Sequence, residues 1–99
     1  THFGLSEGTR IRIDLTDMRL VLSVVEHGSF TRGGHAMNLS LASVSERVGR
    51  MESVLGAPLF ERGRRGVHPT AAGEALVRHA RTILRQVEEM HGDLTTYAQ

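Results

Sequence analysis

Apolar residues recur every three or four positions in three parts of the chain, and this spacing is typical of helices with one buried face. The first of these helices carries four such residues: Met18, Val21, Leu22 and Val25. We take Thr16 as its N-cap and Gly28 as the residue that ends it, because hydroxyl side chains favour helix starts and glycine favours helix ends.

A second, short helix is predicted to begin at Phe30. Its buried positions are predicted to be Phe30, Met37 and Leu39. Gly33 and Gly34 lie inside it, and each costs a helix about 1 kcal/mol relative to alanine, although a missing side chain also lets another backbone approach closely. Asn38 suits a tight turn before the next helix.

The third helix has the strongest local signals. Ser40 is its predicted N-cap, and Leu39 is spaced to pack on Val44 in a hydrophobic staple. Gly56 ends the helix. Its predicted buried stripe consists of Val44, Val48, Met51 and Leu55. The opposite side carries small residues in the first two turns, where a solvated helix usually carries long charged ones.

A hairpin and a long helix complete the pattern. Apolar pieces at Leu59–Phe60 and Val67 flank the sequence GRRG, which predicts two short strands with a charged tip. Thr70 is predicted to cap a helix from Ala71 to about Thr95. Its apolar residues follow a heptad repeat: Leu76, Ala80, Ile83, Val87, Met90 and Leu94. The predicted fold class is all-α with a small β-hairpin, a winged helix-turn-helix followed by a long helix.

Length and composition narrow the class of protein. The chain has 99 residues and no cysteine, so we expect one small domain, or part of a larger protein, without disulfides or thiolate metal sites. No apolar run approaches the roughly 20 residues that span a bilayer. Residues 1–13 lack the apolar stretch of a secretory signal, and we interpret them as a leader or an added remnant outside the fold. A cytoplasmic protein is expected.

The charges are distributed unevenly along the chain. All twelve basic residues are arginine, and the formal net charge is +1. Residues 32–85 hold nine arginines and four glutamates, whereas residues 86–99 hold three acidic residues and no arginine. A basic middle segment favours a partner that carries phosphate groups.

The sequence carries no catalytic signature. Its six histidines show neither metal-ligand spacing nor an H-E-x-x-H pattern, and neither a nucleophile elbow nor a glycine-rich phosphate loop is present. We therefore expect no enzyme activity, no metal and no cofactor.

Three segments resemble the N-terminal region of LysR-type transcriptional regulators, in the same order and without gaps. They are DLTDMRLVLSVVEHGSFTRGG, LSLASVSERVGRMESVLGAPLFERGRRGVHPTAAGEAL and RHARTIL, and the resemblance covers about residues 14–90. The most specific pieces are GSFTR, LG-x-x-LFER and T-x-x-GE. The resemblance implies a winged helix-turn-helix DNA-binding domain over residues 14–69 and a dimerising linker helix over residues 70–99.

The family resemblance also implies partners. Two copies, joined as a homodimer by the long helix, bind double-stranded DNA at a dyad-symmetric operator, and a tetramer of the full-length protein stays open. In this family an effector-binding domain follows, and the chain ends before it, so a small-molecule effector would act only through that domain. No membrane partner is expected.

The chain departs from the family pattern at a few positions. The family commonly has Gln-Pro where this sequence has Leu41 and Ala42, often arginine at Glu46, and alanines at Gly33 and Gly34. The predicted fold is unaffected, but no operator sequence can be carried over from relatives.

The predicted base-reading residues lie at the outward start of the third helix: Leu41, Ala42, Ser45, Glu46 and Arg47. Small side chains let a recognition helix approach base edges, and an apolar group can contact a thymine methyl. Glu46 can accept a hydrogen bond from cytosine, although an ion pair with Arg50, four residues on, is an equal alternative. Arg47 can reach a guanine or a phosphate.

Phosphate contacts are predicted at Ser29, Thr31, Arg32, Ser40, Arg50 and Arg62. Plain helix capping is the alternative for the hydroxyl residues, and an internal salt bridge is the alternative for Arg62. The predicted wing contacts, in an adjacent minor groove, are Arg64, Arg65 and His68. Arginines at a hairpin tip are also often only solvated.

The heptad residues of the last helix are the predicted dimer interface: Leu76, Ala80, Ile83, Val87, Met90 and Leu94. Packing on the helix's own domain is the alternative, although a helix of some 25 residues is about 37 Å long and exceeds the body of a small domain. A second function also stays open, namely a winged helix that has lost DNA binding and serves as a protein-interaction or dimerisation module. Leu41 and Glu46 support it, and the basic middle segment opposes it.

Overall fold

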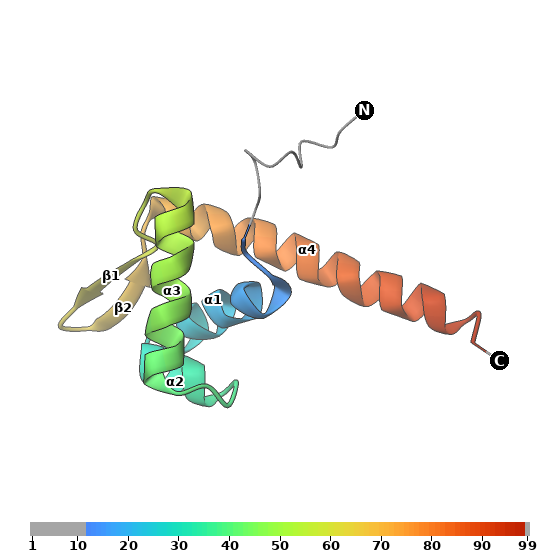
Figure 1. The fold of residues 1–99 in the computed structure, drawn as a ribbon, viewed down its shortest axis with the longest axis horizontal. Coiled ribbons are helices and arrows are strands. Elements are labelled where there is room, and N and C mark those ends of the chain that lie inside the picture. Colours follow the sequence, from blue (N-terminus) through green and yellow to red (C-terminus); the bar gives the residue numbers. More distant parts are fainter. Residues whose placement is uncertain (1–11, 99) are drawn as a thin grey trace.

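A computed structural model describes residues 12–98 of the chain. Its elements, in chain order, are α1 (Leu15–His27), α2 (Phe30–His35), α3 (Leu41–Leu55), β1 (Phe60–Gly63), β2 (Gly66–Pro69) and α4 (Ala71–Thr95). The two strands form an antiparallel hairpin in which Glu61 pairs with His68 and Arg62 with Val67. The hairpin and the free end of α4 extend on opposite sides of the helical body (Figure 1). The predicted fold class is confirmed.

Helix α1 begins two residues earlier than expected. Its N-cap is Asp14, whose side chain accepts a hydrogen bond from the backbone amide of Asp17, while the Asp17 side chain accepts one from the amide of Asp14. The assignment of Thr16 as the cap was therefore wrong, because this reciprocal pair satisfies two free amides and one hydroxyl satisfies only one. The predicted end at Gly28 is confirmed, and Gly28 has the left-handed φ of 64° that favours glycine.

The core lies between α1, α3, the hairpin and the first turns of α4. Its buried residues are Leu20, Val21, Val24, Phe30, Val44, Val48, Met51, Leu59, Phe60 and Val77. Six residues of the predicted buried faces are not fully buried. Leu55 is 47% exposed at the last turn of α3, and five are half-buried: Met18, Leu22 and Val25 on α1, and Met37 and Leu39 in the turn before α3. The buried stripe of α3 therefore ends at Met51.

The turn between α2 and α3 is closely packed. A β-carbon at Gly33 would lie 2.7 Å from the Cα of Val24, and one at Gly34 would collide with a methyl group of Val44. The two glycines therefore let α2 approach α1 and α3, which is the close approach that a missing side chain allows. Asn38 has a positive φ of 59°, in agreement with the predicted tight turn.

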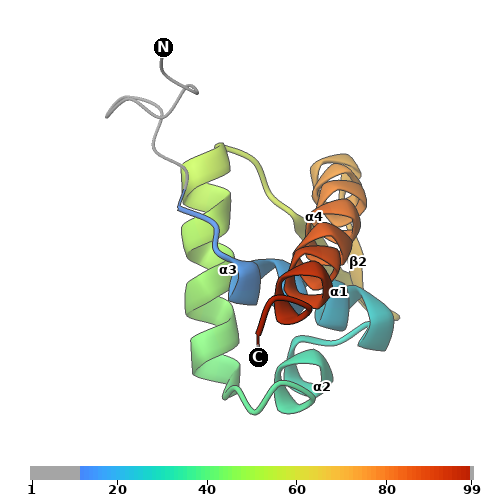
Figure 2. The same ribbon diagram turned by 90° about the vertical axis from the view of Figure 1, so that its right-hand side faces the viewer.

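Both long helices are capped as predicted. Ser40 Oγ accepts a hydrogen bond from the amide of Ser43, and Thr70 Oγ1 accepts one from the amide of Gly73. Thr70 also donates its hydroxyl to the carbonyl of Pro58, which fixes the start of α4 against the loop after α3. Viewed along α4, the helix lies beside α1, while α3 stands apart from it on the other side of the body (Figure 2).

The segment before α1 contributes to the fold as far as the structure describes it. Ile13 packs against the core, and the carbonyl of Arg12 accepts a hydrogen bond from Arg50. Residues 1–11, which make up most of the predicted leader at residues 1–13, lie outside the described residues. Among the helices of residues 12–98, none is long and apolar enough to cross a membrane.

Candidate nucleic-acid interface

The outward face of α3 is exposed over its first two turns. Four of its five predicted base-reading residues are open to solvent: Leu41, Ala42, Ser45 and Glu46. Leu41 is the first residue of the helix and is 52% exposed, although it is a large apolar residue. Gly49 continues this face, and nothing lies within 4 Å of the β-carbon that it lacks, so no contact inside the chain requires a glycine there.

Arg47, the fifth predicted base reader, turns away from this face. Its Nη1 atom lies 2.9 Å from Oδ1 of Asp17 on α1 and 3.7 Å from Oδ1 of Asp14, the N-cap of that helix. Arg50, predicted to contact a phosphate, donates through Nη2 to the same oxygen of Asp17 at 3.0 Å and through Nη1 to the carbonyl of Arg12. An ion pair between Glu46 and Arg50 was the alternative to base contact for Glu46. The described part of the chain does not contain this ion pair.

Asp17 is the buried centre of this cluster. Its side chain has no exposed surface, whereas the side chains of Arg47 and Arg50 keep 27% and 36% of theirs. Burial raises the pKa of the Asp17 carboxyl, but hydrogen bonds from the Asp14 amide, from Arg47 and from Arg50 outweigh it, so this pKa lies below its usual range. The bond to Asp17 likewise raises the pKa of Arg47. The cluster ties the start of α1 to the middle of α3.

The predicted phosphate contacts on α2 are positioned by its N-terminal turn. Ser29 is the N-cap, and its Oγ accepts a hydrogen bond from the amide of Arg32 at 3.0 Å. The Arg32 side chain donates to the carbonyl of His27 at 2.8 Å and is exposed, as is Thr31. Capping by Ser29 and Ser40 is thus present, and both hydroxyls lie at helix starts.

Arg62 on β1 is held by an aromatic ring. Its guanidinium carbon lies 4.4 Å from the centroid of the Phe30 ring, and the Phe30 and Phe60 rings form a T-shaped pair with centroids 5.5 Å apart. An internal salt bridge was the alternative for this residue. The structure contains a cation–π contact in its place, and such a contact orients the guanidinium without neutralising its charge.

The hairpin tip is exposed, and its base is anchored to the helices. Arg64, Arg65 and His68 are all exposed. The amide of Val67 donates to the carbonyl of Gly28 at 3.0 Å. A β-carbon on Gly66, which has a φ of 99°, would lie 2.6 Å from that same oxygen, so the contact requires a glycine.

Two hollows separate the hairpin from α3, and Phe30 and Arg62 border both. The first, of about 270 Å³, is also lined by Thr31, by Leu41, and by Gly28 and Val67, whose backbones are joined by a hydrogen bond. The second, of about 190 Å³, lies against Ser45 and Gly49 farther along α3. The exposed face of α3 therefore runs beside Arg62, an oriented arginine that pairs with no carboxylate of residues 12–98. Within residues 12–98, no group of three or more His, Asp or Glu side chains is placed to hold a metal ion.

Comparison with known proteins identifies the family. Residues 15–74 match the family described as "Bacterial regulatory helix-turn-helix protein, lysR family". The chain belongs to this family.

Two LysR-family relatives illustrate the extent of the similarity. The transcriptional regulator GbpR of Azospirillum brasilense is 35% identical over 85 residues, which are 86% of this chain and 25% of the relative. The transcriptional activator IlvY of Salmonella typhimurium is 37% identical over 82 residues, which are 83% of this chain and 28% of the relative. The chain thus spans about a quarter of the length of the curated relatives it matches.

Solved structures of the LysR family share the fold. The chain is similar to the domain in the BenM DBD/benA site 1 DNA complex, with a TM-score of 0.81 and 29% identity over 87% of this chain and 97% of that one. It is also similar to the CbnR DBD–DNA complex, with a TM-score of 0.79 and 26% identity over 87% of this chain and 99% of that one. These matches include the hairpin and most of α4.

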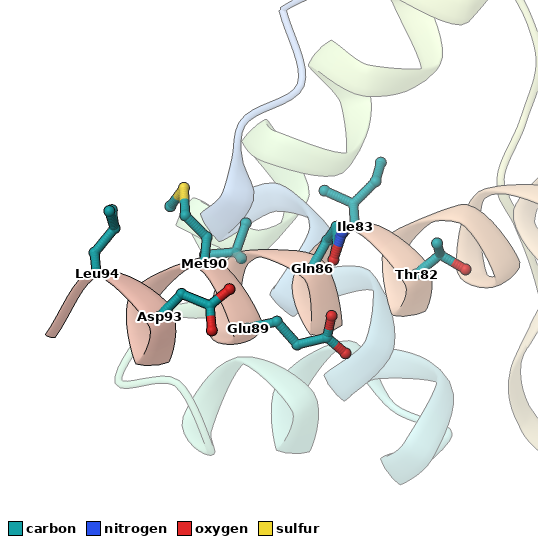
Figure 3. A pocket seen from close by; sticks show the side chains of 8 residues that line it. Thr82, Ile83, Gln86, Glu89, Met90, Asp93 and Leu94 are labelled. Carbon is teal, nitrogen blue, oxygen red and sulfur yellow. The ribbon is translucent and has the colours of Figure 1, made fainter. Parts of the chain in front are cut away.

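The heptad residues of α4 divide into two groups in this LysR-family chain. Leu76 is half-buried against the core and Ala80 is fully buried, so the first two pack on their own domain. The others lie on the free part of the helix, where Val87 is half-buried and three are exposed: Ile83, Met90 and Leu94. Figure 3 shows Ile83, Met90 and Leu94 along one side of α4, with Glu89 and Asp93 on the other.

Sequence reasoning missed two of these arrangements. Asp17 is absent from the predicted site, although it shares a helical face with Leu20, Val21 and Val24, and a carboxylate on a core-facing stripe indicates a buried cationic partner. The stacking of Arg62 on Phe30 has no comparable signal, because the two residues are 32 positions apart and meet only when the hairpin folds back.

Proposed function

We propose that this chain is the DNA-binding region of a LysR-type transcriptional regulator and binds duplex DNA sequence-specifically. In this proposal α3 enters the major groove and the hairpin lies alongside. The observation that carries the proposal is the exposed, small-residue start of α3 beside arginines that no described carboxylate neutralises: Arg32, Arg62, Arg64 and Arg65. The BenM and CbnR domains of similar fold were crystallised as DNA complexes, which supports the same partner here.

The predicted contacts then have distinct roles. Leu41, Ala42, Ser45 and Glu46 face the bases, because the N-terminal turns of a recognition helix contact base edges. The phosphate contacts come from Ser29, Thr31, Arg32, Ser40 and Arg62, and the wing contacts from Arg64, Arg65 and His68. The phosphate contacts fix the register and carry no sequence information.

Arg47 and Arg50 have a different place in the proposal. Both donate to the buried Asp17, so a contact from either to DNA uses its remaining N–H groups or requires it to leave that carboxylate. Their main role is to hold α3 at a fixed angle to α1. This role affects DNA binding through the position of the recognition helix.

We further propose that the exposed apolar residues of α4 join two copies. The four apolar residues on this part of α4 repeat at heptad spacing, and a second copy of the same helix would cover them: Ile83, Val87, Met90 and Leu94. A symmetric dimer would match a dyad-symmetric operator. The longer protein would act in the cytoplasm, with effector binding outside this chain and a tetramer as a further assembly.

Selection from a pool of randomised duplexes, followed by measurement of Kd across salt concentrations, tests the proposal. We expect an enriched two-fold site and a slope of log K against log salt of about −7, if the two phosphate-contacting arginines and the two wing arginines of each subunit of a dimer each displace about one counterion from the DNA. Enrichment without two-fold symmetry would contradict the dimer. Absence of binding at low salt would contradict DNA binding and favour the protein-interaction module.

A further inference from the structure

Leu41 differs from the other exposed apolar residues by its place in the molecule. It is the first residue of α3, and Ser40 before it caps the helix. Side chains in a helix tilt toward its N-terminus, so Leu41 projects from the end of α3 that would enter a groove first. Val54 and Leu55, of similar exposure, lie at the opposite end of the same helix.

The surroundings of Leu41 are those of a group that faces a polyanion. It shares the hollow of about 270 Å³ with Thr31 and Arg62, and Arg62, whose guanidinium is stacked on the Phe30 ring, forms no salt bridge with a carboxylate of residues 12–98. Ala42 follows on the next position and adds a methyl group, and Ser45 lies one turn farther along. Leu41 is thus an apolar side chain with proposed phosphate-binding residues beside it. Such a side chain is complementary to an apolar group on the edge of a base, which lies in a groove between the two sugar–phosphate backbones.

The edge of a base pair in the major groove offers few partners for a leucine. All four bases present hydrogen-bond donors or acceptors there, and the C5 methyl group of thymine is the one apolar group larger than a C–H. Placing a leucine against a donor or acceptor would remove water from a polar group and return no hydrogen bond, which is unfavourable. The 5-methyl group of a pyrimidine is therefore the one feature of the groove that a leucine can favour.

We propose that Leu41 recognises the 5-methyl group of a pyrimidine, so that the operator contains one methyl-bearing base opposite each copy of α3. This inference rests on the proposed function, because it requires α3 to lie in the major groove. The glutamine common at this position in the family would hydrogen-bond to a base edge instead. The source of the methyl group in unmodified DNA is thymine, and 5-methylcytosine carries the same group.

Replacement of single thymines by deoxyuridine in the selected duplex tests the proposal, because uracil lacks only the methyl group. Each half-site should contain one thymine that responds. Replacing that thymine in one half-site should raise the Kd of the unaltered protein about fourfold, the effect of one buried methyl-sized group. The variant Leu41→Ala should bind the thymine duplex more weakly and should show no more than about a 1.5-fold response to that replacement. Leu55→Ala, which has matched chemistry and exposure at the far end of α3, should keep the full response.

A second series of duplexes separates the two sources of the methyl group. A duplex with 5-methylcytosine opposite Leu41, in place of the thymine–adenine pair, should bind more tightly than the same duplex with cytosine. Equal binding of the two would show that thymine is recognised by something other than its methyl group and would overturn the proposal.

Failure of the inference is distinguishable from failure of the proposed function. Sequence-specific, salt-dependent binding with no thymine that responds to loss of its methyl group would overturn the role of Leu41 and leave DNA binding intact. The same conclusion would follow if Leu41→Ala kept the full response. Absence of any DNA binding by the unaltered protein would overturn both.

Discussion

Replacement of Asp17 by asparagine tests whether the buried carboxylate holds α3 in place. The change keeps the shape of the side chain and removes the charge that two arginines share. Removing one partner of a fully buried ion pair costs about 3–5 kcal/mol. Arg47 and Arg50 keep 27% and 36% of their surface and can turn to water, so we expect a smaller loss in the free energy of unfolding, about 2–3 kcal/mol.

The assay is urea unfolding followed by circular dichroism, with a thermal scan beside it. For a domain of this size the expected loss corresponds to a fall in Tm of about 10–20 °C. Asp14→Asn is the matched control, because asparagine caps a helix as well as aspartate does and the Asp14 side chain is 64% exposed. Its ion pair with Arg47 spans 3.7 Å, and we expect its loss to change the stability by less than about 1 kcal/mol.

The same variant should also alter the acid dependence of stability. The pKa of Asp17 in the folded protein is lower than its unfolded value of about 3.9, so the unfolded chain binds more protons between the two values. The stabilisation from Asp17 is therefore complete above the unfolded pKa and is lost as pH falls through the folded pKa. Asp17→Asn should lack this component. A variant within about 0.5 kcal/mol of the unaltered protein, or with the same acid profile, would refute the reasoning.

Three further predictions concern the hairpin and α4. Arg62→Ala should weaken binding to all DNA sequences and reduce the salt slope by about one unit for each phosphate that Arg62 neutralises, and an unchanged slope would remove Arg62 from the phosphate-binding residues. Gly66→Ala should lower the unfolding free energy by about 1–3 kcal/mol, because Gly66 has a positive φ and the new methyl group would meet the carbonyl oxygen of Gly28. Gly63→Ala, with open space around it, should have little effect. Equal losses of the two variants in urea unfolding would contradict this packing. Replacing Ile83 and Val87 together by aspartate should leave the helical circular dichroism intact and give a monomer in sedimentation, and a persisting dimer would show that the copies join elsewhere.

Most of the fold followed from signals local in the chain. Three kinds of signal each act within a few residues of the chain: the caps at Ser40 and Thr70, the glycines at helix ends and the GRRG tip. Their effects can therefore be predicted without the structure. The error at Thr16 was of the same local kind, because Asp14 and Asp17 form a reciprocal cap three residues apart that a search for hydroxyl caps overlooks.

The site was predicted less completely, because its arrangement depends on contacts between distant parts of the chain. Arg47 and Arg50 looked like ligands of DNA on α3 alone, and only the packing of α1 beside α3 reveals that both donate to Asp17. The hollows beside Arg62 likewise exist because the hairpin folds back on Phe30. Sequence reasoning identified which residues are available on each helix face but not which of them the fold itself uses.

Helix α4 has a geometric consequence for the proposed dimer. Its first turns belong to the core through Ala80, its later turns carry Ile83 and Leu94, and the helix is continuous between them. One residue inserted after Ala80 would rotate the later face by about 100°, and an inserted heptad would restore the face but lengthen the helix by about 10.5 Å. Half-sites of a dimeric helix-turn-helix protein must be spaced by whole turns of DNA. In the proposed dimer the operator spacing would therefore depend on the length of α4, a helix outside the proposed DNA contacts.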